Sequence, residues 1–307
     1  MPGAVPEVTL RQMAYFVAVA EHGSFAAAAA RLFVSPSAIA DSVADLEAAL
    51  GAQLCIRRRA HGVSLTSAGA KAAGDARRLL AQAREFQLSL ASSPDELVGP
   101  IAVGCYPTLA PTVLPPLLDV FERAHPRVEL RVVEASQDLL CREVITGGID
   151  LAFVYETLVA EVPARRRLAE LRAHALFAEG HPLAAAPRVS LEQLEEEPLI
   201  LFDTPPADSH TLSLFSARGL MPRIRHRTGS YEAARTLVGR GLGYGIFIQH
   251  RPANMASLDG DPLVAVEIEP AVPPVGIEAI TSEQAAQLPR VRALLDFAAT
   301  IAWAPAD

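Results

Sequence analysis

Apolar side chains recur at helical spacing three times near the start of the chain. The first segment follows Thr9, a residue type that caps helix N-termini, and ends at Gly23; its apolar face consists of Leu10, Met13, Phe16, Val17 and Ala20. Ser24 precedes a second, alanine-rich helix that reaches about Leu32. A third helix begins at Ser35-Pro36, a capping hydroxyl followed by proline at the first helical position, and Gly51 ends it. We therefore expect three short helices joined by sharp turns.

A hairpin and a long helix are expected next. Two short strand-like runs, residues 53–56 and 63–65, are joined by a connection that contains Arg57-Arg58-Arg59, which predicts a hairpin with a basic tip. Helical spacing then extends from Thr66 to about Leu90, with one apolar stripe made of Leu79, Leu80, Ala83, Phe86 and Leu90. Ser92-Ser93-Pro94-Asp95 breaks this helix and marks a domain boundary. A long helix with little else beside it in sequence needs a partner.

The remaining two thirds of the chain alternate between β-branched runs and helical patterns, which is typical of parallel α/β units. Strands are expected at residues 101–104, 128–133, 149–155, 199–202, 224–227, 244–248 and 275–280. Helices are expected at residues 112–124, 137–146, 191–195, 209–218, 231–239 and 283–302. One sheet or two lobes would both fit, and either predicts a ligand cleft beyond the carboxyl ends of the strands.

Composition narrows the class of protein. The chain has 307 residues, half of them hydrophobic and a fifth charged, which excludes disorder for the chain as a whole. At about 150 residues per domain, this length suggests two domains, or three lobes if one is small. No apolar run reaches the roughly 18 residues of a membrane span, and residues 1–7 lack the features of an export signal, so we expect a cytoplasmic protein. Three widely spaced cysteines, Cys55, Cys105 and Cys141, predict reduced thiols.

Charge is distributed unevenly along the chain. The net charge is -8, but residues 1–92 hold nine basic and seven acidic residues, a net +2, and the remainder holds 18 basic and 28 acidic residues, a net -10.

Two helices joined by a brief turn and followed by a basic hairpin fit a winged helix-turn-helix that places the third helix in the DNA major groove. A plain three-helix bundle with a solvated charge run is the alternative that the residues leave open.

The sequence resembles the LysR-type transcriptional regulators over nearly its whole length. The resemblance rests on residues 10–25 and on Val34-Ser35-Pro36-Ser37-Ala38-Ile39, Leu46-Glu47, Leu65-Thr66-Ser67-Ala68-Gly69, Gly147-Gly148-Ile149-Asp150-Leu151-Ala152, His181-Pro182-Leu183-Ala184 and Val238-Gly239-Arg240-Gly241-Leu242-Gly243-Tyr244-Gly245. It implies a two-lobed α/β effector domain like periplasmic binding proteins, preceded by a winged helix-turn-helix and a long linker helix.

This resemblance also implies domain bounds and partners. The DNA-binding domain would cover residues 1–66, the linker or dimerisation helix 67–92 and the effector-binding domain 97–307, with lobe I at about 97–163 plus 268–307 and lobe II at about 164–267. The expected partners are promoter or operator DNA, a small-molecule effector and further copies of the chain in a homodimer or homotetramer, with RNA polymerase as a partner that the family allows. No cofactor, metal or membrane is expected.

The expected DNA-binding residues lie on the third helix, before it and in the hairpin: Arg31, Ser35, Pro36, Ser37, Ala40, Asp41, Arg57, Arg58 and Arg59. Family members often carry polar or basic residues where this chain has Ala40, Asp41 and Ala44. Asp41 would repel phosphate, although a carboxylate can accept a hydrogen bond from cytosine N4. We therefore expect the arginines and the serine hydroxyls to supply a larger share of the affinity, through backbone contacts that position the domain.

The expected effector-binding residues follow predicted strands or open helices: Thr108, Ser136, Asp203, Thr204 and Tyr231. By resemblance the first four lie in loops that line the site, and Tyr231 is a weaker candidate. Thr108 and Ser136 would serve equally well as helix caps. Asp203 would disfavour a nearby carboxylate, so a neutral or cationic effector stays open.

No catalytic constellation stands out in the sequence. The glycine-rich run at residues 239–245 follows a helix and precedes a strand, the reverse of a dinucleotide-binding motif, so we interpret it as a turn. Cys105 ends a strand beside the expected cleft, and a buried structural thiol is favoured over a redox sensor.

Two other functions remain open: a cytosolic solute-binding or sensor module with weak or lost DNA binding, and, more distantly, an enzyme acting in the cleft. The effector, the operator and the direction of regulation are not determined.

Overall fold

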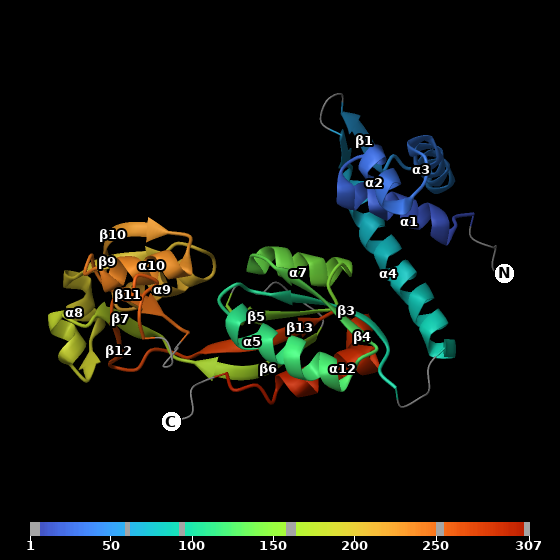
Figure 1. Cartoon of the computed structure of the whole chain (residues 1–307). Helices are drawn as coiled ribbons and strands as arrows, with labels where there is room; N and C mark the ends of the chain where they lie inside the picture. Colours follow the sequence, from blue (N-terminus) through green and yellow to red (C-terminus); the bar gives the residue numbers. More distant parts are fainter. Residues whose placement is uncertain (1–6, 59–61, 92–95, 158–163, 250–254, 304–307) are drawn as a thin grey trace. The chain divides into compact units, whose positions relative to one another are not determined.

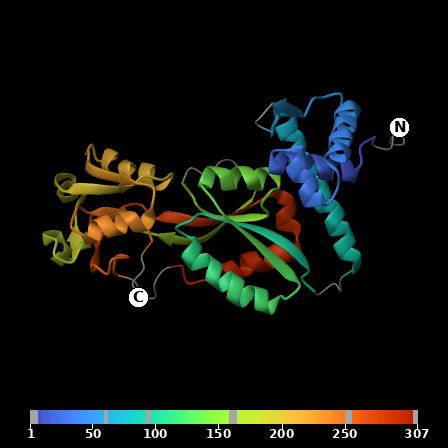
Figure 2. The ribbon, with the colours of Figure 1, turned by 45° about the horizontal axis from the view of Figure 1, so that its top comes forward.

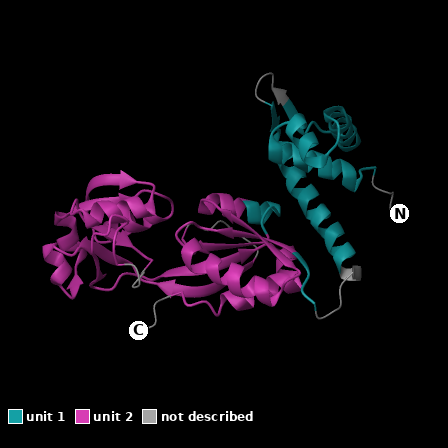
Figure 3. Cartoon of the chain, in the orientation of Figure 1, with its two compact units in different colours: residues 1–99, 143–149 teal, residues 100–142, 150–307 magenta. Residues whose placement is uncertain are grey.

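The computed structural model describes residues 7–58, 62–91, 96–157, 164–249 and 255–303. Its contacts divide the chain into two compact units, residues 1–99 with 143–149 and residues 100–142 with 150–307 (Figure 3). The first unit contains the three short helices, the hairpin and the long helix, and the second contains nearly all of the α/β part. None of the helices in the described ranges is long and apolar enough to cross a membrane.

The N-terminal elements follow the predicted helix starts and ends. They are α1 (Leu10–His22), α2 (Phe25–Leu32), α3 (Pro36–Leu50), the antiparallel strands β1 (Cys55–Arg58) and β2 (Gly62–Leu65), and α4 (Ser67–Ala91) (Figure 1). The side chains of Thr9, Ser24 and Ser35 each accept a hydrogen bond from a backbone N–H in the first turn of their helix. Gly23 and Gly51 end α1 and α3 in the left-handed conformation. These predictions are confirmed.

A small apolar core holds the three helices and the hairpin together. Its buried members come from every one of these elements and include Phe16, Val19, Ala28, Ile39, Val43, Leu46, Leu54 and Cys55. Glu47 connects α3 to the hairpin, since its Oε1 accepts hydrogen bonds from the N–H groups of Leu54 at 2.6 Å and Cys55 at 2.8 Å. On the other strand, the N–H of Val63 donates to the carbonyl of Gly23 at 2.7 Å. The hairpin is therefore held to the helices by backbone hydrogen bonds as well as by packing.

The second unit contains two sheets, and we call the part around the first sheet lobe I. This sheet has five strands in the order β4-β3-β5-β13-β6, with bounds β3 (Gly99–Cys105), β4 (Val128–Glu134), β5 (Leu151–Tyr155), β6 (Ala164–Leu171) and β13 (Val275–Thr281). Strands β3 and β5 are parallel, whereas β13 runs antiparallel to both β5 and β6. Helices lie on both faces of this sheet (Figure 2): α5 (Ala110–Pro116), η1 (Leu117–Phe121), α6 (Glu122–Ala124), α7 (Gln137–Thr146), α11 (Glu283–Gln287) and α12 (Pro289–Ala298).

Lobe II is built around the second sheet, whose strand order is β11-β7-β12-β8. The bounds of these strands are β7 (His174–Ala178), β8 (Arg188–Val189), β11 (Gly245–Phe247) and β12 (Leu263–Ile268), and a parallel pair, β9 (Pro198–Phe202) with β10 (Arg223–Thr228), joins β11 through a bridge between Leu199 and Tyr244. The helices of lobe II are η2 (Pro182–Ala185), α8 (Leu191–Glu196), α9 (Ala207–Ser216) and α10 (Tyr231–Gly239).

The structure differs from the sequence-based expectation in several elements. Strands β6, β7, β8 and β12 were not predicted, and the sheets are mixed rather than parallel. Because β6 pairs with β13, lobe I extends to Leu171 and not only to residue 163. Three consecutive arginines disrupt the apolar alternation of β6, and one of them, Arg166, pairs with Asp296 at 2.6 Å. The helix expected at residues 283–302 is interrupted before Pro289, which cannot donate a backbone hydrogen bond.

Candidate functional site

The N-terminal end of α3 presents small polar groups at the surface. Ser35, Pro36, Ser37 and Asp41 are exposed, and Ala40 is half-buried. The hydroxyl of Ser35 accepts a hydrogen bond from the N–H of Ala38 at 3.2 Å and lies 3.1 Å from the Ser37 hydroxyl. Ile39, Val43 and Leu46 are buried on the opposite face of the helix. The structure therefore exposes the start and the polar face of α3, as an α-helix that enters a DNA groove requires.

The arginines of the expected DNA surface lie on two elements. Arg31 is exposed in the last turn of α2. Arg57 and Arg58 belong to β1, where only their backbone is described, and Arg59 lies outside the described residues. Their assignment to DNA binding remains a prediction.

A pocket within the second unit is lined by side chains of both lobes. Thr108, Tyr155 and Thr157 come from lobe I, and lobe II supplies Phe202, Pro206, Ala207, His210, Thr211, Tyr231, Ile246, Phe247, Ile248 and Gln249. Water-sized spheres can be centred over about 30 Å³ of this pocket, and the wider hollow, including space open to solvent, measures about 440 Å³. Phe202, Tyr231 and Phe247 form its aromatic wall, with edge-to-face centroid distances of 5.9 Å and 5.2 Å.

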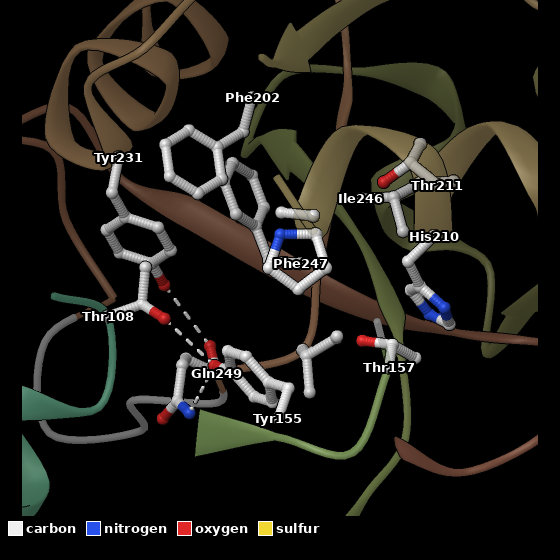
Figure 4. A pocket seen from close by; sticks show the side chains of 13 residues that line it. Thr108, Tyr155, Thr157, Phe202, His210, Thr211, Tyr231, Ile246, Phe247 and Gln249 are labelled. Atoms are coloured by element: carbon white, nitrogen blue, oxygen red, sulfur yellow. Dashed lines mark hydrogen bonds between the residues drawn. The ribbon is translucent and has the colours of Figure 1, made fainter. Parts of the chain in front are cut away.

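A chain of hydrogen bonds joins the two lobes along one side of the pocket. Tyr155, on lobe I, shares a hydrogen bond of 2.9 Å with Thr108 and accepts another, of 2.8 Å, from the side-chain amide of Gln249 (Figure 4). The hydroxyl of Tyr231 in turn donates to the backbone carbonyl of Gln249 at 3.3 Å. Thr108, Tyr155 and Gln249 are buried, so these partners satisfy polar groups that water does not reach.

The pocket is electrically neutral over the lining residues that the structure describes, since none of them is Lys, Arg, Asp or Glu. Burial raises the pKa of Tyr155 to about 12, although the hydrogen bonds with Thr108 and Gln249 partly oppose this shift. Burial lowers the pKa of His210, so its ring is neutral at neutral pH. Within the described part of the chain, Nε2 of His210 has no hydrogen-bond partner. Figure 4 shows His210 and Thr157 across the pocket from Thr108 and Gln249.

The structure brings together two of the five expected effector residues, Thr108 and Tyr231. Ser136 is exposed at the start of α7, where its hydroxyl donates to the Asp138 carboxylate and holds the pKa of that group below its usual range. Asp203 pairs with Arg227 of β10 at 3.0 Å, and the Thr204 hydroxyl donates to the carbonyl of Gly229 at 3.3 Å. These last three residues are not among those that line the pocket. The negative charge of Asp203 is thus balanced by Arg227 and does not face the cavity.

Most of the lining was missed by sequence reasoning. Tyr155 and Phe202 end the strands β5 and β9, so the rule that ligands lie beyond strand carboxyl ends could have found them. His210 lies on α9 and Gln249 after β11, and the sequence contains no local signal that would have brought either to this site.

The three cysteines, all within the described residues, are buried and form no disulfide with one another. Burial, reinforced by the Glu134 carboxylate, raises the pKa of the Cys105 thiol far above its ordinary value. In the described ranges, no group of three or more His, Cys, Asp or Glu residues is placed to hold a metal ion.

Two family models cover both parts of the chain. Residues 10–70 match the bacterial regulatory helix-turn-helix protein of the lysR family, and residues 94–302 match the LysR substrate binding domain. The chain belongs to the LysR family. It is therefore a DNA-binding transcriptional regulator with an N-terminal helix-turn-helix and a C-terminal effector-binding domain.

Individual LysR proteins are similar to this chain over most of its length. A probable hydrogen peroxide-inducible genes activator of Mycobacterium leprae is 32% identical over 76% of this chain and 76% of its own. A putative LysR family transcriptional regulator of Pseudomonas aeruginosa has a solved structure that is 35% identical, covers 95% of this chain and 98% of its own, and superposes with a TM-score of 0.64. The full-length regulator CbnR, solved with its target DNA, is 28% identical over 95% of this chain and 100% of its own, with a TM-score of 0.55.

Proposed function

We propose that this LysR regulator is controlled by a neutral, mainly apolar small molecule that binds in the pocket between the two lobes. The observation that carries the proposal is the pocket lining, which combines an aromatic wall with hydroxyl and amide groups and, among the described residues, contains no charged side chain. A carboxylate or phosphate transferred there would lose its hydration without gaining a cationic partner. The unpaired Nε2 of His210 would hydrogen-bond one polar group of the effector.

Effector binding would change how the lobes close. Only about 30 Å³ of the pocket admits the centres of water-sized spheres, so we expect the pocket to widen when an organic effector binds. Widening would break or lengthen the hydrogen bond between Gln249 of lobe II and Tyr155 of lobe I. An effector that binds the wider arrangement more tightly shifts the population toward it. The arrangement of the paired DNA-binding domains would then change as well.

Three further assignments support the same function. We infer that α4 forms the contact between subunits, because Leu79 and Phe86, seven residues apart and on one face of that helix, are 44% and 67% exposed. We infer that the protein binds its effector without converting it, since the similar proteins of the family are transcriptional regulators. We also infer that the protein acts in the cytoplasm, because in bacteria the chromosomal DNA that a transcriptional regulator binds lies there.

The proposal is tested by thermal shift of the full-length protein with matched pairs of small molecules, each an aromatic alcohol or amide and the corresponding carboxylate. We expect the neutral members to raise the melting temperature, because ligands that bind only the folded state stabilise it. A hit should then change the affinity for promoter DNA. Stabilisation by the carboxylates alone would contradict the proposed ligand class.

Variants separate the pocket from the residues that do not line it. Tyr231→Leu and His210→Phe should weaken binding of a hit, because the first removes a hydroxyl and part of the aromatic wall and the second removes the free Nε2. Ser136→Ala, whose hydroxyl faces Asp138 instead of the pocket, is the matched control and should bind the hit as the unchanged protein does.

A further inference from the structure

Phe33 is an unexpected residue at the surface of the DNA-binding domain. It lies in the turn between α2 and α3, and its side chain is 91% exposed, more than any other large apolar side chain in the described part of the chain. Ile39, Val43 and Leu46 of the next helix form the core without it. The fold therefore gains no burial from the ring of Phe33.

The backbone makes the choice of phenylalanine more unusual. Phe33 has φ 56° and ψ 41°, the left-handed conformation, and it is the one residue other than glycine with positive φ among those described. Its N–H and that of Val34 both reach the carbonyl of Ala29, which closes the C-terminal end of α2. Glycine or asparagine is the usual residue at such a position, because a larger side chain is strained there. Helix termination thus disfavours phenylalanine at position 33, and core packing does not require it.

The position of Phe33 indicates what the ring contacts. It precedes Ser35, the N-cap of α3, by two residues, and Ser35, Pro36 and Ser37 are exposed beside it in the chain. In helix-turn-helix proteins the N-terminal residues of the second helix of the motif contact base edges. In the major groove the one apolar group on a base edge is the 5-methyl of thymine, which phenylalanine is suited to contact.

We propose that Phe33 is a specificity-determining residue that packs against a thymine methyl group in the operator. The proposal rests on the DNA-binding function of the family and extends it to a residue outside the polar and basic groups. Since the ring carries no charge, its contribution is sequence-specific and independent of counterion release.

The test uses duplex DNA that the full-length wild-type protein itself selects from a randomised pool. Phe33→Asn is the informative variant, because asparagine tolerates the left-handed conformation and should leave the melting temperature equal or higher. We expect its affinity for the selected duplex to fall about tenfold, with an unchanged slope of log affinity against log salt concentration. Met221→Asn, which removes an apolar side chain that is 83% exposed on the effector domain, is the matched control and should bind normally.

Replacing thymine by deoxyuridine, one position at a time, removes single methyl groups. We expect one substitution to weaken binding by the wild type and to have no further effect on Phe33→Asn. Equal affinity of the variant and the wild type for the selected duplex would overturn the proposal, as would conversion of Phe33→Asn to a monomer, which would assign the ring to a subunit contact. If the wild type selects no duplex at all, DNA binding itself fails and this inference fails with it.

Discussion

Among single residues, the glycine at the start of α4 has the least room. A Cβ built on Gly69 would lie 2.0 Å from the carbonyl oxygen of Leu54, a backbone atom just before β1. The N–H of Gly69 also donates a hydrogen bond of 2.9 Å to the side-chain hydroxyl of Thr66. The close approach of α4 to the hairpin thus depends on the missing side chain, and the glycine within the family-like run at residues 65–69 has a steric reason.

We therefore expect Gly69→Ala to destabilise the DNA-binding unit by about 1–3 kcal/mol, because a backbone clash must be relieved. The opposing gain in helix propensity is smaller, at most about 1 kcal/mol. Chemical denaturation followed by circular dichroism measures the difference. Gly180→Ala is the control, since a Cβ there would have nothing within 4 Å, and a similar loss of stability in both variants would contradict the steric explanation.

A second single residue, Cys105, has an environment that predicts how it reacts with peroxide. Its thiol is buried, donates to the carbonyl of Tyr106 at 3.5 Å, and has its pKa raised by burial and by Glu134. Oxidation by peroxide requires an accessible thiolate. We expect hydrogen peroxide to leave the DNA affinity unchanged in the wild type and in Cys105→Ser alike. Sulfenic acid at Cys105, detected by mass spectrometry together with a change in DNA binding that Cys105→Ser abolishes, would show that this regulator senses peroxide through the thiol.

At the scale of elements, α4 combines two kinds of surface. Its N-terminal part contributes Ala73 and Ala76 to the buried residues, whereas Leu79 and Phe86 are exposed farther along. The side chain of Leu90, the last residue of the expected stripe, lies outside what the structure describes. A helix of 25 residues that is buried over only part of its length is suited to pair with the same helix of a second subunit.

Leu79→Asp should therefore convert the oligomer to a smaller species, because a charge would be buried without a partner in the interface. Size-exclusion chromatography with light scattering measures the mass. The control is Ala81→Asp, an exposed position about 200° away around α4 at the helical 100° per residue, which should keep the wild-type mass. If Leu79→Asp keeps that mass as well, α4 is not the subunit contact.

At the scale of the whole molecule, the DNA-binding part and the effector-binding part carry opposite net charges. Residues 1–92 carry a net charge of +2, and the rest of the chain carries -10. Nonspecific binding of DNA to the effector part is therefore unfavourable, and we expect the DNA affinity to depend on a few arginines near α3 and in the hairpin.

Arg58→Ala should accordingly weaken binding to promoter DNA and reduce the slope of log affinity against log salt by about 0.9 for each phosphate that the arginine neutralises. Fluorescence anisotropy over a salt series measures both values. Arg123→Ala removes an exposed arginine of α6 in the effector part and should change neither. An unchanged slope in Arg58→Ala would remove the hairpin from the DNA contact.

Much of the architecture could be read from the sequence because its signals are local. Thr9, Ser24 and Ser35 start helices, and Gly23 and Gly51 end them, through contacts within a few residues. The order of motifs along the chain likewise determined the family. The arginine-rich strand β6 escaped prediction, since its place beside β13 depends on residues about 110 positions away in sequence.

The pocket was decided by tertiary structure alone. Tyr155 meets Thr108 across 47 residues and Gln249 across 94, so neither pairing leaves a mark in any local window of the sequence. The sequence by itself determined the two parts of the protein, the helix boundaries of the N-terminal part and the exposed face of α3, because capping and periodicity act over a few residues. Folding decided which strand ends meet, which charges are neutralised and which side chains face the effector, because these properties depend on what each residue contacts across the two lobes.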